Sequence, residues 1–392
     1  MASRDHRTDA SRVMLGKALE GLVARARSGR SACRVGLMAA GGEHSDQEFL
    51  VAARAAMWED PALTVVGVGP RPVAPPPRGM DWIETGCDGS ELAQGMEKAL
   101  DQGLIQGAVA LHYPFPLGVA TVGRIVTPAL GKAMYVACTT GMSAARRPQA
   151  LLLNAVLGQA VARATGTPAP TLGVLNVDAA PQVLRALGRM AQRGYALLLG
   201  QSQRGDGGPL LRGNDLLRGA ADICAVDTLT GNVLMKLFGA FTSGGAYETV
   251  GWGYGPAVGD GWNKIVSIIS RASGAPVIAN ALAYTASAVR GELPVVVASE
   301  LRQARAAGLD EELALLDKTE GAPSAEVKAP PAEPTDEEIH GVDVLDLERA
   351  VRCLWKEGIY AEAAMGCTGP VVKLAAAKAA GARKILAANG YV

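Results

Sequence analysis

The chain has 392 residues, of which 49% are hydrophobic and 19% charged, and 38 basic residues balance 38 acidic ones. This length and composition suggest two or three domains with a large buried core. A formal net charge of zero and an aromatic content of 4% argue against a surface for nucleic acid or for an anionic membrane. No apolar run reaches eighteen residues, so we expect no transmembrane helix.

The N-terminus and the cysteines point to a reducing compartment. The first nine residues are polar and carry both signs of charge, so they lack the apolar core of a signal peptide and we expect a cytoplasmic protein. The six cysteines include no CxxC pair, which argues against a zinc site and against a disulfide framework. We therefore expect no metal, and most of the cysteines to be small buried residues. They are Cys33, Cys87, Cys138, Cys224, Cys353 and Cys367.

From Cys33 onward, apolar runs alternate with segments of helical periodicity. Strands are expected at 34–39, 63–69, 108–112, 134–137, 171–178, 195–201, 222–226 and 274–280, and helices at 47–57, 90–102, 181–193, 233–241 and 262–272. The alternation predicts an α/β fold with a doubly wound, mostly parallel sheet. In such sheets ligands bind at the carboxyl ends of the strands. The glycine-rich loop 243–259 follows a helix and is no dinucleotide fingerprint, which disfavours a nicotinamide dehydrogenase.

Polar residues at three strand ends are candidates for chemistry. His44 and His112 each follow a predicted strand and are candidate acid/base groups, although structural histidines are commoner at such positions. The cluster at 137–147 contains threonine, glycine, serine and arginine side chains, which suit an anion or an acyl phosphate. A solvated turn before a helix explains the cluster equally well.

A candidate phosphate site lies in the stretch from Asp227 to Lys236, which reads DTLTGNVLMK. The glycine lets a ligand approach the backbone, and the N-terminus of the following helix offers unpaired N–H groups to an anion. Lys236 would add a positive charge on the first turns of the helix. The alternative is that the threonine and asparagine side chains only cap the helix.

The ends of the chain differ from its body. An amphipathic helix at 11–28 makes residues 1–30 an N-terminal arm, and residues 31–317 form the α/β domain. Residues 318–338 are rich in Pro, Ala, Glu and Lys and are expected to be a linker. Residues 339–392 form a small α/β module of helix, strand, tight loop, strand and helix. Its second strand could instead begin one long helix.

Cys367 lies in this module in the sequence Gly366-Cys367-Thr368-Gly369, where small neighbours leave its thiol accessible. Successive N–H groups of a glycine-flanked turn can stabilise an anion, so Gly366, Thr368 and Gly369 are candidate donors to a thiolate or to the oxyanion of a thioester adduct. The alternative is that Cys367 only fills a turn. A thiol that carries an acyl group and a site that holds phosphate together predict phosphorolysis of a thioester.

Several segments resemble known families. The runs 171–178 and 227–236 resemble the PlsX-like phosphate acyltransferases of phospholipid synthesis, which share a fold with phosphotransacetylases and isocitrate dehydrogenases. From about residue 30 to the end, the chain more closely resembles the family of component C alpha subunits of glycine/sarcosine/betaine reductase complexes. The segments that carry this second resemblance are 112–123, 253–256, 270–276 and 366–370.

The resemblance implies a function. In that family an acetyl group arrives from a carboxymethylated selenoprotein, is held as a thioester on the alpha subunit, and is released by inorganic phosphate as acetyl phosphate. The active thiol of the family falls on Cys367. The acyltransferase motif carries phosphate binding over to Thr230, Gly231, Asn232 and Lys236. The implied partners are the component C beta subunit and the selenoprotein, and no cofactor beyond phosphate as substrate is implied.

Two other hypotheses stay open. The chain could be a direct phosphate acyltransferase that moves an acyl group from a carrier protein or coenzyme A to phosphate, with Cys367 structural. It could also be a non-catalytic subunit that binds an acyl or phosphate ligand and docks a catalytic partner.

Overall fold

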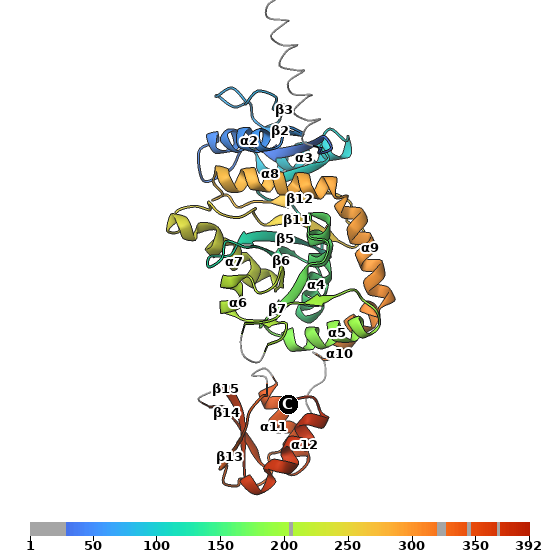
Figure 1. Ribbon diagram of the computed structural model, residues 1–392. Helices are drawn as coiled ribbons and strands as arrows, with labels where there is room; N and C mark the ends of the chain where they lie inside the picture. Colours follow the sequence, from blue (N-terminus) through green and yellow to red (C-terminus); the bar gives the residue numbers. More distant parts are fainter. Residues whose placement is uncertain (1–28, 204–206, 320–326, 343–345, 367–368) are drawn as a thin grey trace, which may run out of the picture. The chain divides into compact units, whose positions relative to one another are not determined.

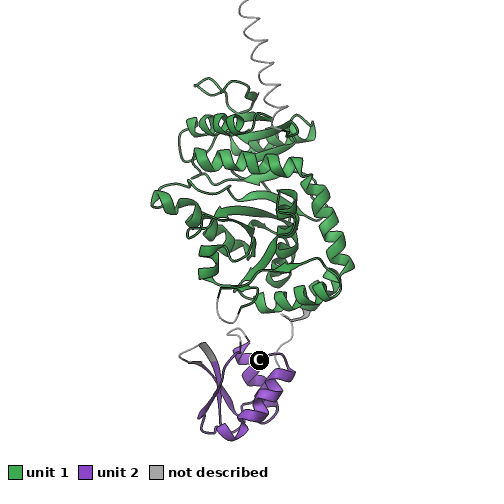
Figure 2. Cartoon of the chain, viewed as in Figure 1, with its two compact units in different colours: residues 1–317 green, residues 318–392 purple. Residues whose placement is uncertain are grey.

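The structure is a computed structural model that describes residues 29–203, 207–319, 327–342, 346–366 and 369–392. The chain divides into two compact units, Met1–Asp317 and Lys318–Val392 (Figure 2). The helix predicted at 11–28 lies outside the described residues. Within the described ranges, no helix is both long enough and apolar enough to cross a membrane.

A twelve-stranded mixed sheet forms the centre of the described part of the first unit (Figure 1). In sheet order its strands are β3 (Asp81–Glu84), β2 (Leu63–Gly69), β1 (Cys33–Met38), β4 (Gly107–Ala110), β12 (Val266–Ile268), β11 (Gly255–Gly259), β5 (Val119–Val126), β6 (Ala133–Met142), β10 (Ile223–Ala225), β7 (Thr171–Leu175) and β8 (Leu198–Leu199), with β9 (Leu210–Leu211) also paired to β7. Among the described residues of this unit, the helices are α2 (Gln47–Glu59), α3 (Gly89–Asp101), α4 (Arg147–Ala164), α5 (Ala180–Gln192), α6 (Gly213–Arg218), α7 (Thr228–Ala240), the short η1 (Phe241–Ser243), α8 (Ala275–Arg290), α9 (Leu293–Ala306) and α10 (Leu309–Thr319).

The sheet has two parallel halves that run in opposite directions. Strands β3, β2, β1, β4 and β12 are parallel to one another, and so are β6, β10, β7, β8 and β9. Antiparallel pairing of β11 and β5 joins the halves and reverses the direction between them. Each half therefore has its own edge of carboxyl strand ends, where loops can form a binding site.

Helices cover both faces of the first half of the sheet. Gly36 of β1 faces Met96 of α3, and Gly107 of β4 faces Thr285 of α8. Gly107 is in register with Val35, the neighbour of Gly36. Because successive residues of a strand point to opposite faces, α3 and α8 lie on opposite sides of the sheet.

The second half is covered in the same way. Gly123 of β5 faces Met235 of α7, and Gly158 of α4 contacts Ala137 of β6. Gly123 is in register with Val136, the neighbour of Ala137, so α7 and α4 lie on opposite sides. The predicted α/β class with a large, mostly parallel, doubly wound sheet is confirmed.

Two predicted elements are wrong. The segment 262–272 was expected to be a helix, but it contains the strand β12, which pairs with β4 and β11. The segment 274–280 was expected to be a strand, but it opens the helix α8, with a proline in its first turn. Short, evenly apolar runs of this kind suit a buried strand and a buried helix equally, so periodicity does not separate them.

The second unit has a three-stranded antiparallel sheet in the order β13 (Glu337–Ile339), β15 (Gly369–Leu374), β14 (Ala361–Gly366) within its described residues. Helices α11 (Leu347–Lys356) and α12 (Ala379–Ala388), with the short η2 (Ala376–Lys378), accompany it, and the unit has its own apolar core. The second predicted strand is a strand, not the start of a long helix. β13 begins inside the range predicted as linker.

Strands β14 and β15 pair as far as Gly366 and Gly369. Cys367 and Thr368, between them, lie outside the described residues. The predictions for these two residues therefore stay predictions.

Candidate functional site

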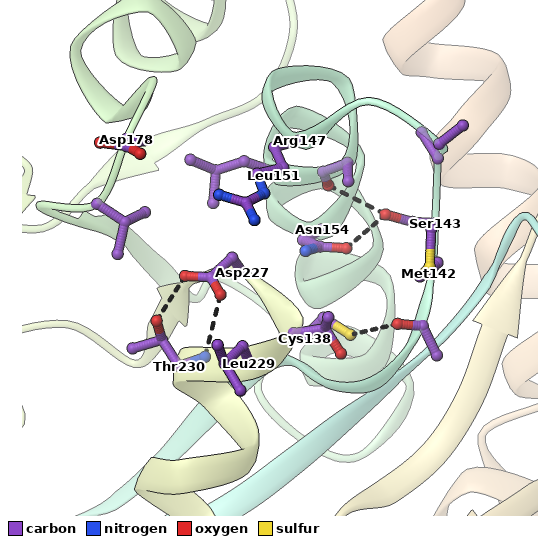
Figure 3. Close-up of a pocket in the computed structure, with 16 residues that line it drawn as sticks. Cys138, Met142, Ser143, Arg147, Leu151, Asn154, Asp178, Asp227, Leu229 and Thr230 are labelled. Carbon is purple, nitrogen blue, oxygen red and sulfur yellow. Dashed lines mark hydrogen bonds between the residues drawn. The ribbon is translucent and has the colours of Figure 1, made fainter.

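A cavity of about 500 Å³ lies at the carboxyl ends of β6, β10 and β7 (Figure 3). We call it the strand-end cavity. Its wall combines apolar side chains with hydroxyl, amide, carboxylate and guanidinium groups. The lining residues are Cys138, Gly141, Met142, Ser143, Ala144, Ala145, Arg147, Ala150, Leu151, Asn154, Val177, Asp178, Asp227, Thr228, Leu229 and Thr230.

Three segments that are far apart in the sequence meet in this cavity. They are the polar cluster at 137–147, the end of the predicted strand at Asp178, and the start of the DTLTGN motif at Asp227. They meet because β10 lies between β6 and β7 in the sheet and all three strands run in the same direction. The first part of the 137–147 cluster is strand and not a solvated turn, because β6 continues to Met142.

The N-terminus of α7 is capped by the carboxylate of Asp227, the residue that precedes the helix. One oxygen of Asp227 accepts a hydrogen bond from the Thr230 backbone N–H at 3.0 Å, and the other accepts one from the Thr230 hydroxyl at 2.6 Å. The helix begins at Thr228, earlier than expected, so the whole TLTGN sequence is helical. Capping by Asp227 thus accounts for the positions of Asp227 and Thr230.

Gly231 and Asn232 dock α7 on β6 and do not line the cavity. A side chain at Gly231 would collide with the carbonyl oxygen of Cys138. The Asn232 side-chain amide donates a hydrogen bond to the carbonyl oxygen of Thr139 at 3.2 Å. The glycine of the motif therefore allows the helix to approach the sheet closely.

Cys138 contributes a buried thiol to the cavity wall. It donates a hydrogen bond to the carbonyl oxygen of Thr140 at 3.0 Å. Burial raises the pKa of this thiol to about 11, and nearby hydrogen bonds only partly oppose that effect. Burial therefore disfavours the thiolate, the nucleophilic form of Cys138, at neutral pH. Cys138 is 2% exposed, in agreement with the expectation of a small buried cysteine.

Arg147 supplies the positive charge of the cavity. It is the first residue of α4, it is exposed, and its guanidinium points into the cavity (Figure 3). Among the described residues, no carboxylate forms an ion pair with it. The neighbouring polar groups of Ser143 and Asn154 are already hydrogen-bonded within the protein. The Ser143 hydroxyl donates to the Asn154 side-chain oxygen at 2.7 Å, and the Asn154 side-chain amide donates to the carbonyl oxygen of Val226 at 2.9 Å. These bonds brace the loop that presents Arg147.

Lys236 lies at a different cavity, of about 400 Å³, which it lines together with Tyr247 and Glu248. We call it the Lys236 cavity. The lysine ammonium lies 3.7 Å from a carboxylate oxygen of the buried Glu248 and donates a hydrogen bond to the Ser270 hydroxyl at 3.2 Å. Glu248 also accepts hydrogen bonds from the hydroxyls of Tyr254 at 3.1 Å and Ser273 at 2.9 Å. Burial beside Glu248 raises the pKa of Tyr254.

The two candidate histidines lie apart from the strand-end cavity. His44 packs edge-on against the ring of Tyr247, 5.2 Å between centroids, and its Nε2 is buried without a hydrogen-bond partner in the described part of the chain. His112 is exposed and lies beside Gly89 at the start of α3. In the described ranges, no cluster of three or more His, Cys, Asp or Glu residues could hold a metal ion.

Comparisons with known proteins identify the family. A family model described as "Fatty acid synthesis protein" matches residues 33–373. The glycine/sarcosine/betaine reductase complex component C subunit alpha of Peptoclostridium acidaminophilum is 45% identical over 361 residues, which cover 92% of each chain.

Two solved structures show looser similarity. A branched-chain phosphotransacylase from Enterococcus faecalis V583 is 17% identical with a TM-score of 0.46, over 66% of this chain and 99% of that one. A 4-hydroxythreonine-4-phosphate dehydrogenase from Burkholderia phymatum is 16% identical with a TM-score of 0.38, over 67% and 99%. By the family model and the 45% identical relative, the chain belongs to the fatty acid synthesis protein family, in the group that contains the component C alpha subunit of the glycine/sarcosine/betaine reductase complex.

Proposed function

We propose that this chain is the acyl-transferring subunit of a glycine reductase-type complex and passes an acetyl group from a thioester to inorganic phosphate. The observation that carries the proposal is Arg147, a guanidinium that points into a cavity of about 500 Å³ and has no ion-pair partner in the described residues. The proposal also draws on the relative, which is named as the alpha subunit of component C of such a complex.

The strand-end cavity has the chemistry that phosphate and a short acyl group need. A guanidinium presents a fork of N–H donors that matches phosphate oxygens. The N-terminal ends of α4 and α7 open onto the same cavity, and helix N-termini favour anions. The carboxylate of Asp227 is engaged by Thr230, which limits its repulsion of an anion. Leu151 and Met142 provide an apolar wall for a methyl group.

The proposed donor is an acetyl thioester on Cys367, which lies outside the described residues. A phosphate oxygen attacks the thioester carbonyl carbon and forms a C–O bond. The tetrahedral intermediate collapses, the C–S bond breaks, and the thiol leaves with the proton that phosphate gives up. The product is acetyl phosphate. Backbone N–H donors at Gly366, Thr368 and Gly369 would stabilise the oxyanion, and one such donor is typically worth about 3 kcal/mol.

Arsenolysis of acetyl phosphate tests this proposal on the purified chain. Acetyl phosphate acylates the thiol, arsenate then takes the acetyl group, and the unstable acetyl arsenate hydrolyses, so acetyl phosphate disappears. We expect wild type and a Cys353→Ala control to be active and Cys367→Ala to be inactive. Cys353 suits the control because it lies in the same unit and is only partly buried. Labelling of Cys367 by radioactive acetyl phosphate, stable to acid but released by hydroxylamine, would identify the thioester.

The size of the strand-end cavity supports a second candidate. The cavity is several times larger than a phosphate ion and is partly apolar, so it has room for an acyl chain together with phosphate. In this alternative the chain transfers an acyl group directly from a carrier protein or coenzyme A. Full arsenolysis activity of Cys367→Ala, with no labelled thioester, would favour it over the covalent mechanism.

The proposed partners are a component C beta subunit and a carboxymethylated selenoprotein, which are the partners that the family resemblance implies. The relative is named as one subunit of a complex, which supports partner subunits for this chain. If the isolated wild-type chain is inactive and adding the beta subunit restores turnover, labelling of Cys367 decides the role of this chain. Labelling of Cys367 would show that this chain is catalytic. Turnover without a label on Cys367 would show that this chain is a docking subunit.

A further inference from the structure

Helix α2 presents an exposed tryptophan. Trp58, in the last turn of the helix, is 85% exposed, and Val51, two turns earlier on the same side, is 49% exposed. We call the side of α2 that carries Val51, Ala55 and Trp58 the α2 face. Among the described residues, Trp58 has no hydrogen bond and no ring contact. Tryptophan is enriched among the residues that carry binding energy at interfaces, so the α2 face is a candidate contact surface.

The opposite side of α2 belongs to the core. The helix packs on α8 and on β2 (Figure 1). Its buried residues are Phe49, Leu50, Ala52, Ala53 and Ala56. The α2 face lies on the other side of the helix, and in the described part of the chain its residues stay exposed.

The chain enters the fold beside the end of α2. Arg30 lies 3.3 Å from a carboxylate oxygen of Asp60, the residue that follows α2. The Arg290 guanidinium holds both segments, because it lies 2.5 Å from the Asp60 carboxylate and donates a hydrogen bond to the carbonyl oxygen of Ser31 at 2.8 Å. The segment that precedes Arg30 is therefore tethered two residues from Trp58.

The conformation of Gly29 suits the end of a helix at this tether. Gly29 has a φ of 63°, in the left-handed region. A glycine in this region commonly follows the last residue of a helix. The sequence predicts an amphipathic helix at residues 11–28, which we call the arm segment. A helix of that length would be about 27 Å long, enough to run along the whole of α2.

The charges of the arm segment complement the end of α2. The arm segment contains four basic residues and one acidic residue, and two of the basic residues, Arg25 and Arg27, lie at the end nearest Arg30. The last turn of α2 contains no basic residue, and the exposed Glu59 forms no ion pair within the described ranges. The C-terminal end of a helix is itself negative, which adds to the attraction.

We propose that the arm segment packs on the α2 face, with its apolar side over Trp58 and Val51 and its basic end beside Glu59. Because both helices end at the same tether, they run in the same direction. The occupant is a segment of the same chain, since a short tether gives it an effective concentration of about millimolar at the α2 face. The proposal does not depend on the proposed function.

Limited trypsin digestion of the purified full-length chain tests whether the arm segment is covered. Trypsin cuts after its four basic residues, and mass spectrometry follows the loss of the N-terminal fragments. Truncating a tryptophan at the contact raises the population of the open form, so we expect cleavage of Trp58→Ala to be at least about tenfold faster than that of wild type. Leu130→Ala is the matched control, because Leu130 is 67% exposed and lies outside the α2 face, and it should be cut at the wild-type rate. Equal rates for wild type and Trp58→Ala would overturn the proposal, and circular dichroism melting checks that both variants fold.

Charge reversal tests the position of the basic end. The double variant Arg25→Glu, Arg27→Glu should be cut faster at the remaining basic residues of the arm segment, because glutamates then face Glu59. Adding Glu59→Lys to this variant should slow the cleavage again, because opposite charges meet once more. Fast cleavage that Glu59→Lys does not slow would place the basic end of the arm segment elsewhere and contradict the proposal.

Acrylamide quenching of Trp58 fluorescence separates the arm segment from other occupants. The signal of Trp58 is the difference between wild type and Trp58→Phe. We expect Trp58 to be shielded in the isolated chain at low and high protein concentration alike, because a tethered segment covers it. Shielding that appears only at high concentration would identify a second copy, and shielding that needs a purified component C beta subunit would identify that subunit. Either result, or quenching of Trp58 as free as that of tryptophan in water, would overturn the proposal.

Discussion

The strand-end cavity and the Lys236 cavity both adjoin α7 and both contain a cationic side chain, yet the two cations are placed differently. Arg147 has no carboxylate partner in the described residues, and the nearby Asp227 is engaged by Thr230. Lys236 lies beside the buried Glu248, which holds three segments of the chain together. A cation in a binding motif is therefore available to a ligand only if the fold leaves its charge uncompensated.

The largest expected effect comes from removing Glu248, the centre of the Lys236 cavity. Glu248→Ala leaves the buried hydroxyls of Tyr254 and Ser273 without an acceptor, and each unsatisfied buried group costs about 1–3 kcal/mol. We expect the free energy of unfolding in urea to fall by about 3 kcal/mol. Glu43→Ala, at an exposed position in the first unit, is the control and should change it by less than about 0.5 kcal/mol. Equal stability of both variants would show that Glu248 has no structural role.

A smaller loss is expected at the contact between α7 and β6. Gly231→Ala forces a methyl group against the carbonyl oxygen of Cys138, and overpacking of this kind costs about 1–3 kcal/mol. Gly188→Ala in α5 is the matched control, because its new methyl group meets no atom within 4 Å. That control should stabilise the protein by up to about 1 kcal/mol, since alanine favours helix over glycine. Urea unfolding of both variants compares them, and opposite signs are expected.

The Cys138 thiol in the strand-end cavity makes the stability of the protein vary with pH in the alkaline range. Burial raises the pKa of Cys138 from 9.0 to about 11 in the folded protein. Between pH 9 and 11 the unfolded chain therefore releases this proton while the folded protein retains it, so stability falls as pH rises. The contribution is complete below pH 9. We expect wild type to lose stability more steeply than Cys138→Ala in urea unfolding across this pH range, and parallel slopes would contradict the raised pKa.

The smallest effect is expected for Lys236→Met. The lysine side chain is 57% exposed, and Glu248 retains its two hydroxyl donors when the ammonium is removed. The exposed ammonium is solvated and lies 3.7 Å from the carboxylate, so water screens the pair and the free energy of unfolding should change by less than about 1 kcal/mol. A loss of stability as large as that expected for Glu248→Ala would show that the buried Glu248 carboxylate depends on the Lys236 charge. The two partners would then contribute equally to stability.

The sequence predicts the helices and strands of this protein better than it predicts which of them lie next to one another in the fold. The strand at 63–69 has the predicted bounds because four of its seven residues are β-branched, which favours a strand. The segment 262–280 was predicted wrongly because it has no clear period. The polar strand ends at 137–147, Asp178 and Asp227 were each visible, but their meeting depends on the order of β6, β10 and β7. That order is set by pairings between distant residues, which local patterns do not encode.

The motif residues show the same limit. The DTLTGN sequence predicts a helix N-terminus, and the structure has one. What the motif does not reveal is that Gly231 and Asn232 face β6 and that Lys236 meets Glu248, a residue of a glycine-rich loop with no pattern of its own. Arg147 was seen only as one member of a polar cluster. Whether Arg147 is available to an anion depends on which carboxylates lie near its guanidinium, and only the fold determines those neighbours.

The most direct test of the account is the Michaelis constant for arsenate in acetyl phosphate arsenolysis, measured for wild type, Arg147→Met and Lys236→Met. A hydrogen bond to a charged group is worth about 1.5–3 kcal/mol, so we expect this constant to rise about 10- to 100-fold in Arg147→Met. In Lys236→Met we expect it to change less than about threefold, because Lys236 lines the other cavity and an exposed, solvent-screened charge acts only weakly on an anion in the strand-end cavity. The reverse pattern, a large rise for Lys236→Met and none for Arg147→Met, would place phosphate at the Lys236 cavity and contradict the account.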